Sequence, residues 1–314
     1  MPAILQVHNL VKHYGGFAAV KGVSFDVQEG EVFSLLGPNG AGKTTTISVL
    51  STLYAATSGD AIIGGHSVSK EPMAVRRLIG VVPQDLAIYE DLTARENLSF
   101  WGQMYGLGGK SLWARIDQVL EQIGLRERAN QRVKAYSGGM KRRVNIGVGL
   151  LHKPRLLFMD EPTVGIDPQS RRAILDSVKE LNKGGMTIIY TTHYMEEAQE
   201  LSDRVGIIDH GELIALGTQT ELTRQVGEND TLILDLAEGE DAAGLAAAMR
   251  TVPTVLRADA SDQAVTVIAP EAEDILAPAV TQANAMGVRI RSVTIQEPNL
   301  EAVFLHLTGR ALRD

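Results

Sequence analysis

A glycine-rich segment that ends in a lysine and a threonine is the strongest chemical signal in the sequence. Its eight residues are Gly37, Pro38, Asn39, Gly40, Ala41, Gly42, Lys43 and Thr44. Glycines in such a loop let consecutive backbone N–H groups turn toward phosphate oxygens. We expect Lys43 to bridge the β- and γ-phosphates of a nucleotide and the Thr44 hydroxyl to coordinate magnesium. The pattern predicts a phosphate-binding loop, and we assign these eight residues and the adjacent Thr45 to the nucleotide site.

Two adjacent acids at the end of an apolar run provide a second element of this chemistry. Residues 156–159 are all apolar and predict a buried strand, which Asp160 and Glu161 follow directly. Asp160 is the candidate magnesium ligand, and Glu161 is the candidate general base for an attacking water. Because adjacent residues on a strand face opposite ways, we expect the two carboxylates to have different roles.

A second glycine pair opens another predicted helix. Ser137 is followed by Gly138, Gly139 and Met140 and by a helical run through residue 151. The serine is a typical N-cap, and the glycines leave the amides of the first helical turn bare. Such a helix start binds anions. One chain therefore carries two predicted phosphate sites of different construction.

These motifs, in this order, resemble the nucleotide-binding subunit of ATP-binding cassette (ABC) transporters, over roughly residues 4–221. The segment from Ser137 to Met140 resembles the family's signature motif. Gln84 lies in a segment similar to the glutamine loop, Asp167 in one similar to the D-loop, and His193 matches the switch histidine. The resemblance implies a P-loop NTPase (RecA-like) core of the α/β class, with antiparallel β and helical subdomains.

The resemblance also implies a mechanism that uses ATP and Mg²⁺. Two subunits would pack head to tail, with each ATP held between the phosphate loop of one copy and the signature helix of the other. Asp167 is an implied nucleotide-binding residue as well. The implied catalytic residues are Lys43, Gln84, Glu161 and His193, and the implied metal ligands are Thr44, Gln84 and Asp160. Tyr14 lies where the family places an aromatic ring against adenine. Taken alone, Tyr14 would be a packing residue, Gln84 a turn residue and His193 an ordinary polar residue.

The elements that must position these residues follow from the apolar patterns. Residues 31–36 predict a strand before the phosphate loop, residues 45–53 a helix after it, and residues 186–192 a strand before His193. A helical subdomain is expected at about 85–150. In the family this subdomain receives a helix of the membrane subunit. Its aromatic residues suit either such an interface or an ordinary core, and both possibilities stay open.

After residue 221 the sequence changes character. We place a nucleotide-binding domain at 1–221 and a second, α+β domain of the ferredoxin-like sort at 222–314. The expected strands are 231–236, 264–268 and 288–296, and the expected helices are 241–250, 271–286 and 300–307. The tail from Glu297 to Arg310 is similar to that of export ATPases of the daunorubicin-resistance type, the partners of ABC-2 permeases. Regulation, dimerisation and a plain cap on the core are the possible roles of this domain.

Composition excludes several classes of protein. The net charge of −8 disfavours a protein that coats nucleic acid, and the absence of cysteine removes disulfides and thiol chemistry. No apolar run reaches the ~20 residues that cross a bilayer, so we expect a separate permease. The histidines show no ligand spacing for a transition metal, which leaves magnesium as the only expected metal.

The leading hypothesis is the ATPase subunit of an exporter of a drug, antibiotic, lipid-like or other hydrophobic substrate. We expect a homodimer, or a heterodimer with a related ATPase, that is cytoplasmic and peripheral on the cytoplasmic face of the membrane through an ABC-2-type permease. The alternatives are a soluble ABC ATPase that acts on nucleic acid or ribosomes, and an importer ATPase with a regulatory C-terminal domain. The first alternative would be expected to show two cassettes, a coiled-coil insertion or a basic face, and none is visible in the sequence.

Overall fold

The computed structural model describes residues 2–224, 229–296 and 299–308. Internal contacts divide the chain into two compact units between Thr218 and Gln219. The predicted boundary between residues 221 and 222 would fall inside a short helix, α8 (Gln219–Thr223). Each unit is described by itself below.

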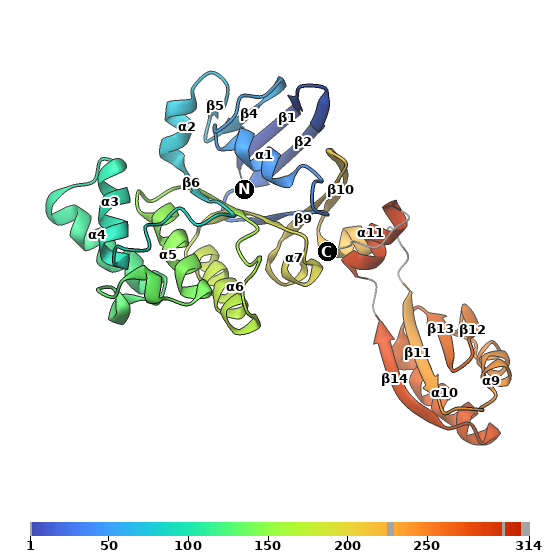
Figure 1. The fold of residues 1–314 in the computed structure, drawn as a ribbon. Helices are drawn as coiled ribbons and strands as arrows, with labels where there is room; N and C mark the ends of the chain where they lie inside the picture. Colours follow the sequence, from blue (N-terminus) through green and yellow to red (C-terminus); the bar gives the residue numbers. More distant parts are fainter. Residues whose placement is uncertain (1, 225–228, 297–298, 309–314) are drawn as a thin grey trace. The chain divides into compact units, whose positions relative to one another are not determined.

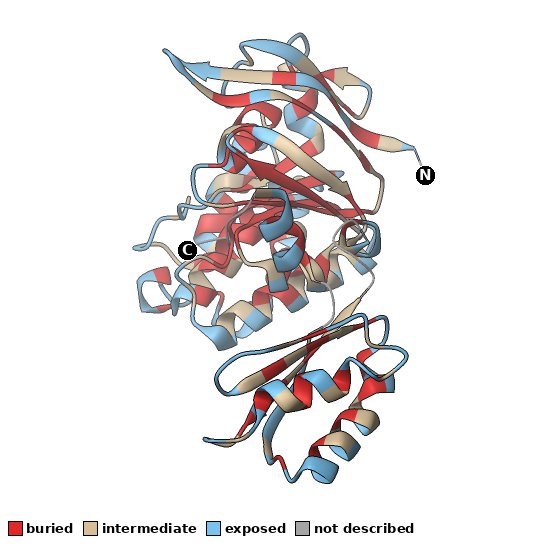
Figure 2. Cartoon of the chain, turned by 90° about the vertical axis from the view of Figure 1, so that its right-hand side faces the viewer, coloured by how far each residue is buried: buried red, intermediate tan, exposed pale blue. Residues whose placement is uncertain are grey.

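The centre of the first unit is a six-stranded sheet (Figure 1). In spatial order its strands are β10 (Glu212–Gly217), β9 (Arg204–Asp209), β3 (Val32–Leu36), β8 (Thr187–Thr192), β7 (Leu156–Asp160) and β6 (Ile79–Val82). All neighbours pair in parallel except β10, which is antiparallel to β9. Every residue of β3, β7 and β8 is buried (Figure 2), which accords with the mostly apolar sequences of β3 and β7, while β8 also contains three threonines. The carboxyl ends of parallel strands meet at one edge, where ligands bind in such sheets.

A second sheet in this unit is antiparallel. Its strands, in spatial order, are β2 (Phe17–Gln28), β1 (Ala3–Tyr14), β4 (Ser58–Ile63) and β5 (His66–Ser67). The ring of Phe25 on β2 stacks on that of Phe33 on β3, with centroids 5.0 Å apart. The two sheets therefore share one apolar core. This arrangement confirms the predicted α/β core with an antiparallel subdomain.

Seven α-helices are described in the first unit. They are α1 (Lys43–Leu50), α2 (Pro72–Leu78), α3 (Ala94–Met104), α4 (Gly109–Gln122), α5 (Gly138–Leu150), α6 (Pro168–Lys183) and α7 (Met195–Leu201). α3, α4 and α5 share an apolar cluster and form the predicted helical subdomain. The first helix begins and ends earlier than the predicted 45–53, because Gly42 caps it with a φ of 110° and Thr52 leaves helical geometry with a φ of 64°.

The second unit contains a four-stranded antiparallel sheet. Its elements, in chain order, are β11 (Asp230–Leu236), α9 (Ala242–Met249), β12 (Arg257–Ala260), β13 (Ala264–Ala269), α10 (Ala272–Met286) and β14 (Ile290–Gln296). The spatial order β12-β13-β11-β14 and the order of elements are those of the predicted ferredoxin-like fold. The sequence analysis missed β12, because this edge strand has the charged residues Arg257 and Asp259 and no large apolar side chain.

Two helices flank this sheet along the chain. α8 precedes it, and α11 (Leu300–Thr308) follows it and packs on α8. Four residues of the tail that resembles export ATPases, Glu297, Pro298, Gly309 and Arg310, lie outside the described residues. The structure therefore describes the helix of the tail, and the resemblance at those four positions rests on the sequence alone.

Candidate functional site

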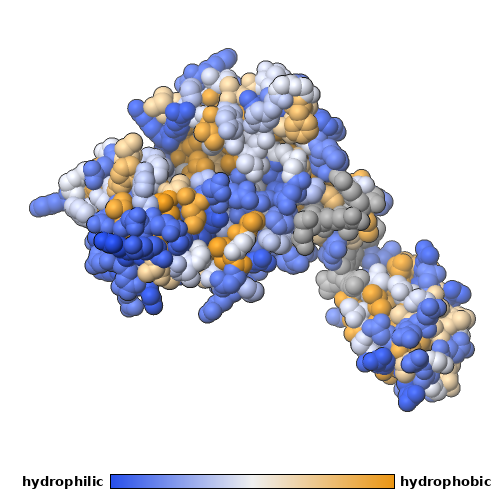
Figure 3. Space-filling view, in the orientation of Figure 1, coloured by the Kyte–Doolittle hydropathy of each residue, from blue (hydrophilic) through white to orange (hydrophobic). Residues whose placement is uncertain are grey.

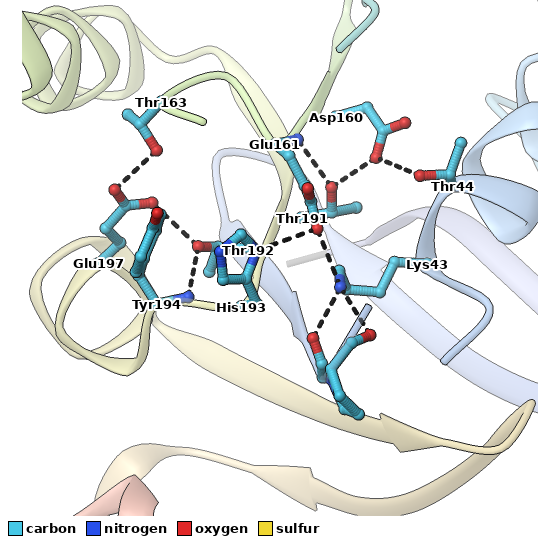
Figure 4. Close-up of polar contacts among 12 residues, drawn as sticks. Lys43, Thr44, Asp160, Glu161, Thr163, Thr191, Thr192, His193, Tyr194 and Glu197 are labelled. Atoms are coloured by element: carbon cyan, nitrogen blue, oxygen red, sulfur yellow. Dashed lines mark hydrogen bonds and ion pairs between the residues drawn. The ribbon is translucent and has the colours of Figure 1, made fainter. Parts of the chain in front are cut away.

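The phosphate loop joins β3 to α1 and encloses the ammonium group of its lysine. Lys43 is 4% exposed, and its Nζ donates to the carbonyl oxygens of Gly37 at 2.6 Å and Pro38 at 3.0 Å. The same Nζ lies 2.9 Å from Oε1 of Glu161 (Figure 4). Gly42 needs its missing side chain, since a Cβ there would lie 2.6 Å from the carbonyl oxygen of Ala19. The loop is therefore held tightly around Lys43.

Asp160, at the end of β7, accepts hydrogen bonds from two hydroxyl groups. Thr44 Oγ1 donates to its Oδ1 at 3.2 Å, and Thr191 Oγ1 at 2.6 Å. Burial raises the pKa of Asp160, although both hydrogen bonds act in the opposite direction. The Thr44 hydroxyl and the Asp160 carboxylate are hard oxygen donors, the type that Mg²⁺ prefers when phosphates supply further ligands. The described residues contain no cluster of three or more His, Cys, Asp or Glu that could hold a metal alone.

Glu161 lies one residue beyond β7 and has the left-handed backbone value of φ 43°. The strict alternation of a strand, on which the sequence analysis based the separate roles of the two acids, therefore does not extend to Glu161. This unusual backbone aims its carboxylate at Lys43 and at the buried His193, whose Nδ1 is 3.3 Å from Oε1. Burial acts to raise the pKa of Glu161, but Lys43 and His193 outweigh it and lower the pKa.

A cavity of about 310 Å³ adjoins these groups. Tyr14, Thr44, Gln84 and Asp160 all line it, so the predicted adenine, magnesium and glutamine-loop residues share one space. The sequence analysis missed Tyr54, which also lines the cavity and meets Tyr14 edge to face at a centroid distance of 6.1 Å. No sequence signal joins these two tyrosines, because they come from different elements.

The backbone of the glutamine loop is tied to the helix that follows the signature motif. The buried Arg142 of α5 donates from one guanidinium nitrogen to the carbonyl of Pro83 at 2.8 Å and from the other to the carbonyl of Gln84 at 2.6 Å. Asn145 of the same helix accepts from the backbone N–H of Ala87 at 3.1 Å. Sequence reasoning missed both side chains, which look like ordinary polar residues of a helix.

The signature motif caps α5 as predicted. Ser137 is the N-cap, and its hydroxyl accepts the backbone N–H of Met140 at 3.3 Å. Gly139 has a further reason to be glycine, because a Cβ there would collide with the side chain of Ser170 on α6. Asp167 in turn caps α6 and accepts the N–H of Ser170 at 2.9 Å. The signature motif and the D-loop are therefore direct neighbours.

The structure brings most of the predicted residues together in one place. Lys43, Thr44, Asp160, Glu161 and His193 form a connected group at the ends of β3, β7 and β8 (Figure 4). The signature motif is separate from this group, and none of its residues is among those that line the described cavity beside Thr44. One chain thus presents two distinct half-sites.

Comparison with known proteins supports the same interpretation. The sequence model of the family described as "ABC transporter" matches residues 20–164. The chain is 50% identical to the linearmycin resistance ATP-binding protein LnrL of Bacillus subtilis (strain 168), over 99% of this chain and 100% of that protein. The chain belongs to the ABC transporter ATP-binding protein family. A second ABC relative, the daunorubicin resistance ATP-binding protein DrrA3 of Streptomyces coeruleorubidus, is 39% identical over 97% of this chain and 96% of its own length.

Solved ABC structures share the fold of the first unit. One is a dimeric structure of a post-hydrolysis state of the ATP-binding cassette MJ0796 bound to ADP and Pi. It has 27% identity and a TM-score of 0.62, and the match covers 68% of this chain and 98% of that one. As an ABC transporter ATP-binding protein, the chain is an ATPase subunit, and subunits of this family dimerise and work with a membrane permease. Within the described residues, every helix is too short or too polar to span a bilayer.

Proposed function

We propose that this chain hydrolyses Mg-ATP to power an exporter of a drug, antibiotic, lipid-like or other hydrophobic substrate. The observation that carries the hydrolytic part is the contact group of Lys43, Glu161 and His193. Glu161 has a lowered pKa and is therefore ionised at neutral pH, as a base for water must be. Lys43 and His193 both lie against its Oε1, where they would contact the γ-phosphate. Thr44, Asp160 and Gln84 would hold Mg²⁺, which supplies charge neutralisation of the phosphates.

The working unit in this proposal is a head-to-tail dimer, a homodimer or a heterodimer with a related ATPase. The separation of the signature motif from the cavity beside Thr44 supports it. Ser137, Gly138, Gly139 and Met140 would close the nucleotide site of the partner, together with Asp167. Each chain alone would then be catalytically incomplete.

The export role rests on the relatives. Proteins named for linearmycin and daunorubicin resistance and for Nod factor export match nearly the whole chain, including its second unit. We propose that the permease is a separate ABC-2-type polypeptide and that the chain is cytoplasmic and attached to the membrane through it. An importer or a nucleic-acid or ribosome ATPase would not account for these relatives.

The permease would dock on the helical subdomain. Tyr89 and Phe100 are 48% and 38% exposed there and meet edge to face with centroids 5.1 Å apart. Leu98, on the same helix as Phe100, is fully buried and belongs to the core. Figure 3 shows patches of hydrophobic residues within the otherwise hydrophilic surface of the first unit. Trp101 is partly buried against the core cluster, so the aromatic residues divide between core and surface, and the exposed pair suits an interface hot spot.

Substitution of Glu161 by Gln tests the hydrolytic assignment. The variant keeps Lys43 and Thr44 and is expected to bind ATP and to accumulate as a dimer. Its turnover should fall by roughly 10²- to 10⁴-fold, the contribution of a general base. ATP hydrolysis and size-exclusion chromatography with ATP measure the two effects. Glu180→Gln, an exposed carboxylate on α6, is the control, with unchanged turnover expected.

Wild-type hydrolysis by the Glu161→Gln chain would exclude Glu161 as the base.

Affinity purification of the tagged chain from membranes tests which partner the chain binds. Recovery of an integral membrane permease is expected. Recovery of ribosomes or nucleic acid without a membrane protein would instead favour the soluble alternative.

A further inference from the structure

A buried carboxylate that the sequence analysis did not assign to the site contacts the segments that carry Glu161 and His193. Glu197, on α7, is 2% exposed. It accepts hydrogen bonds from three hydroxyl groups. Thr163 Oγ1 lies at 2.7 Å and Thr192 Oγ1 at 3.0 Å (Figure 4), and Tyr190 OH lies at 2.9 Å. All three hydroxyl groups donate to this carboxylate, so Glu197 fixes the direction of three hydrogen bonds at once.

Stability alone does not account for this group. Removing a carboxylate from water is costly, and well-packed apolar residues of similar volume often stabilise a core as well or better. The side chain of Arg171 lies near, with its Nε 3.7 Å from Glu197 Oε1, and that Nε makes no hydrogen bond. We therefore attribute the buried Glu197 carboxylate to a need for fixed side-chain geometry and not to a gain in folding stability.

Two of the hydroxyl groups hold the two segments that carry the central pair of the site. Thr163 follows Glu161 by two residues, and Thr192 directly precedes His193. Glu161 and His193 meet at 3.3 Å. The contacts form a closed ring from Glu161 through Thr163, Glu197 and Thr192 to His193 and back. A shift of Glu197 would move both segments.

His193 is held from its other side as well. Thr192 Oγ1 donates to Glu197 and accepts the backbone N–H of Tyr194 at 2.9 Å. The ring of Tyr194 lies 4.2 Å from that of His193, and the Arg171 guanidinium lies 4.3 Å from the centroid of Tyr194. Glu197 thus holds the residue before the histidine, and Arg171 contacts the ring of the residue after it.

We propose that Glu197 is a positioning residue that sets the separation of the Glu161 carboxylate and the His193 imidazole. This inference rests on the proposed function, in which these two side chains act on water and the γ-phosphate. ATP binding uses Lys43, Thr44 and the cavity, and none of the three hydroxyl groups on Glu197 belongs to them. Loss of Glu197 therefore slows turnover and leaves nucleotide affinity in place.

Glu197→Gln in the full chain tests the proposal. The amide of glutamine has one oxygen that accepts and one NH₂ group that does not. One of the hydrogen bonds from Thr163 or Thr192 therefore weakens, while the size of the side chain is kept. We expect kcat to fall by roughly tenfold to a hundredfold, as for a misplacement of about 1 Å. The KM for ATP and the affinity for a fluorescent ATP analogue should stay within about twofold of the wild-type values. Thermal unfolding reports any loss of structure.

The matched control is Glu31→Gln, which makes the same change at another buried carboxylate. Glu31 is 6% exposed and accepts the backbone N–H of Gln28. If the loss of kcat in Glu31→Gln and Glu197→Gln follows the fall in unfolding temperature of each variant, Glu197 has only a structural role and the proposal is wrong. A loss of kcat in Glu197→Gln alone supports it.

Thr163→Val removes one donor to Glu197 and tests the ring directly. It should lower kcat less than Glu197→Gln and should add little when combined with it, because both changes act through the same contact. Fully additive losses would overturn the proposal. Wild-type kcat in Glu197→Gln together with an inactive Glu161→Gln chain would overturn it too and leave the proposed function standing. Normal turnover by Glu161→Gln would instead refute the proposed function.

Discussion

Asp160 and Glu161 show at the scale of single residues how two adjacent acids take different roles. Burial raises the pKa of Asp160. Burial acts on Glu161 in the same direction, but Lys43 and His193 reverse the result and lower its pKa. Environments that move the pKa values of neighbouring acids apart are how proteins assign different tasks to them. In the proposed function Glu161 acts as an ionised base, whereas the negative charge of Asp160 would gain its full stabilisation only with a cation.

Replacing Asp160 by Asn should therefore stabilise the protein without nucleotide while it impairs hydrolysis. The folded-state pKa lies above the ordinary value of 3.8, so the ionised form costs folding free energy as the pH rises. We expect a higher unfolding temperature for Asp160→Asn at neutral pH. The gain should vanish below the ordinary pKa, where the wild-type carboxyl is protonated as well. Thermal unfolding across this pH range checks the sign, and a lower unfolding temperature at neutral pH would contradict it.

At the scale of elements, the close packing of α5 against α6 joins the signature motif to the D-loop. Gly139 lies where a side chain would strike Ser170, and Asp167 caps the helix to which Ser170 belongs. The glycine at this position is therefore fixed by helix packing as well as by any ligand. Sequence reasoning assigned both glycines the same task, although the neighbours of Gly138 differ.

The two glycines provide a matched pair of substitutions. Gly139→Ala forces α5 and α6 apart and should lower the free energy of unfolding by about 1–3 kcal/mol, as overpacking does. Gly138→Ala puts its Cβ 3.5 Å from the side chain of Ile166, an ordinary contact, and should be tolerated. Urea unfolding of both variants measures the difference. Equal stability of the two would show that the close approach is not maintained.

At the scale of the whole molecule, the two units have separate cores. The apolar cluster of the second unit draws its buried residues from positions 232–288. The two large clusters of the first unit draw theirs from positions 4–208. Each unit thus has the apolar core of an independent domain.

A chain that ends at Thr218 should therefore fold and bind ATP with roughly the affinity of the full chain, because every proposed ATP contact precedes that residue. Circular dichroism and binding of a fluorescent ATP analogue are the measurements. An unfolded product would show that the first unit depends on the second. The oligomeric state of the shortened chain with ATP then tests the proposed role of the second unit in dimerisation.

The sequence predicted the parts of the site that local patterns encode. The phosphate loop follows a strand and opens a helix, so its eight residues determine their own geometry, and the acids after β7 follow from an apolar run. The left-handed backbone of Glu161 and its contact with Lys43 depend on tertiary packing and could not be predicted. Glu197 escaped notice because α7 contains three glutamates, and only the tertiary fold distinguishes the buried one.

In the ferredoxin-like domain, the pattern of alternating apolar residues predicted the long strands but failed for β12. That strand pairs on one side only, and it buries one alanine, Ala258, and no larger side chain. Edge strands need few apolar residues, so hydrophobic periodicity is weakest for them. The predicted fold class is nevertheless correct, because the other five elements and their order in the chain are sufficient to indicate it.

The ion pair between Lys43 and Glu161 also bears on which anions the loop selects. Because the lysine holds an internal carboxylate, an incoming anion enters by exchange and must compete with it. Chloride, acetate and other singly charged ions offer no more than the carboxylate does, whereas a triphosphate brings several oxygens to the loop amides at once. The internal competitor would thus disfavour weakly binding anions, and in the proposed function the same displacement would free the Glu161 carboxylate when ATP binds.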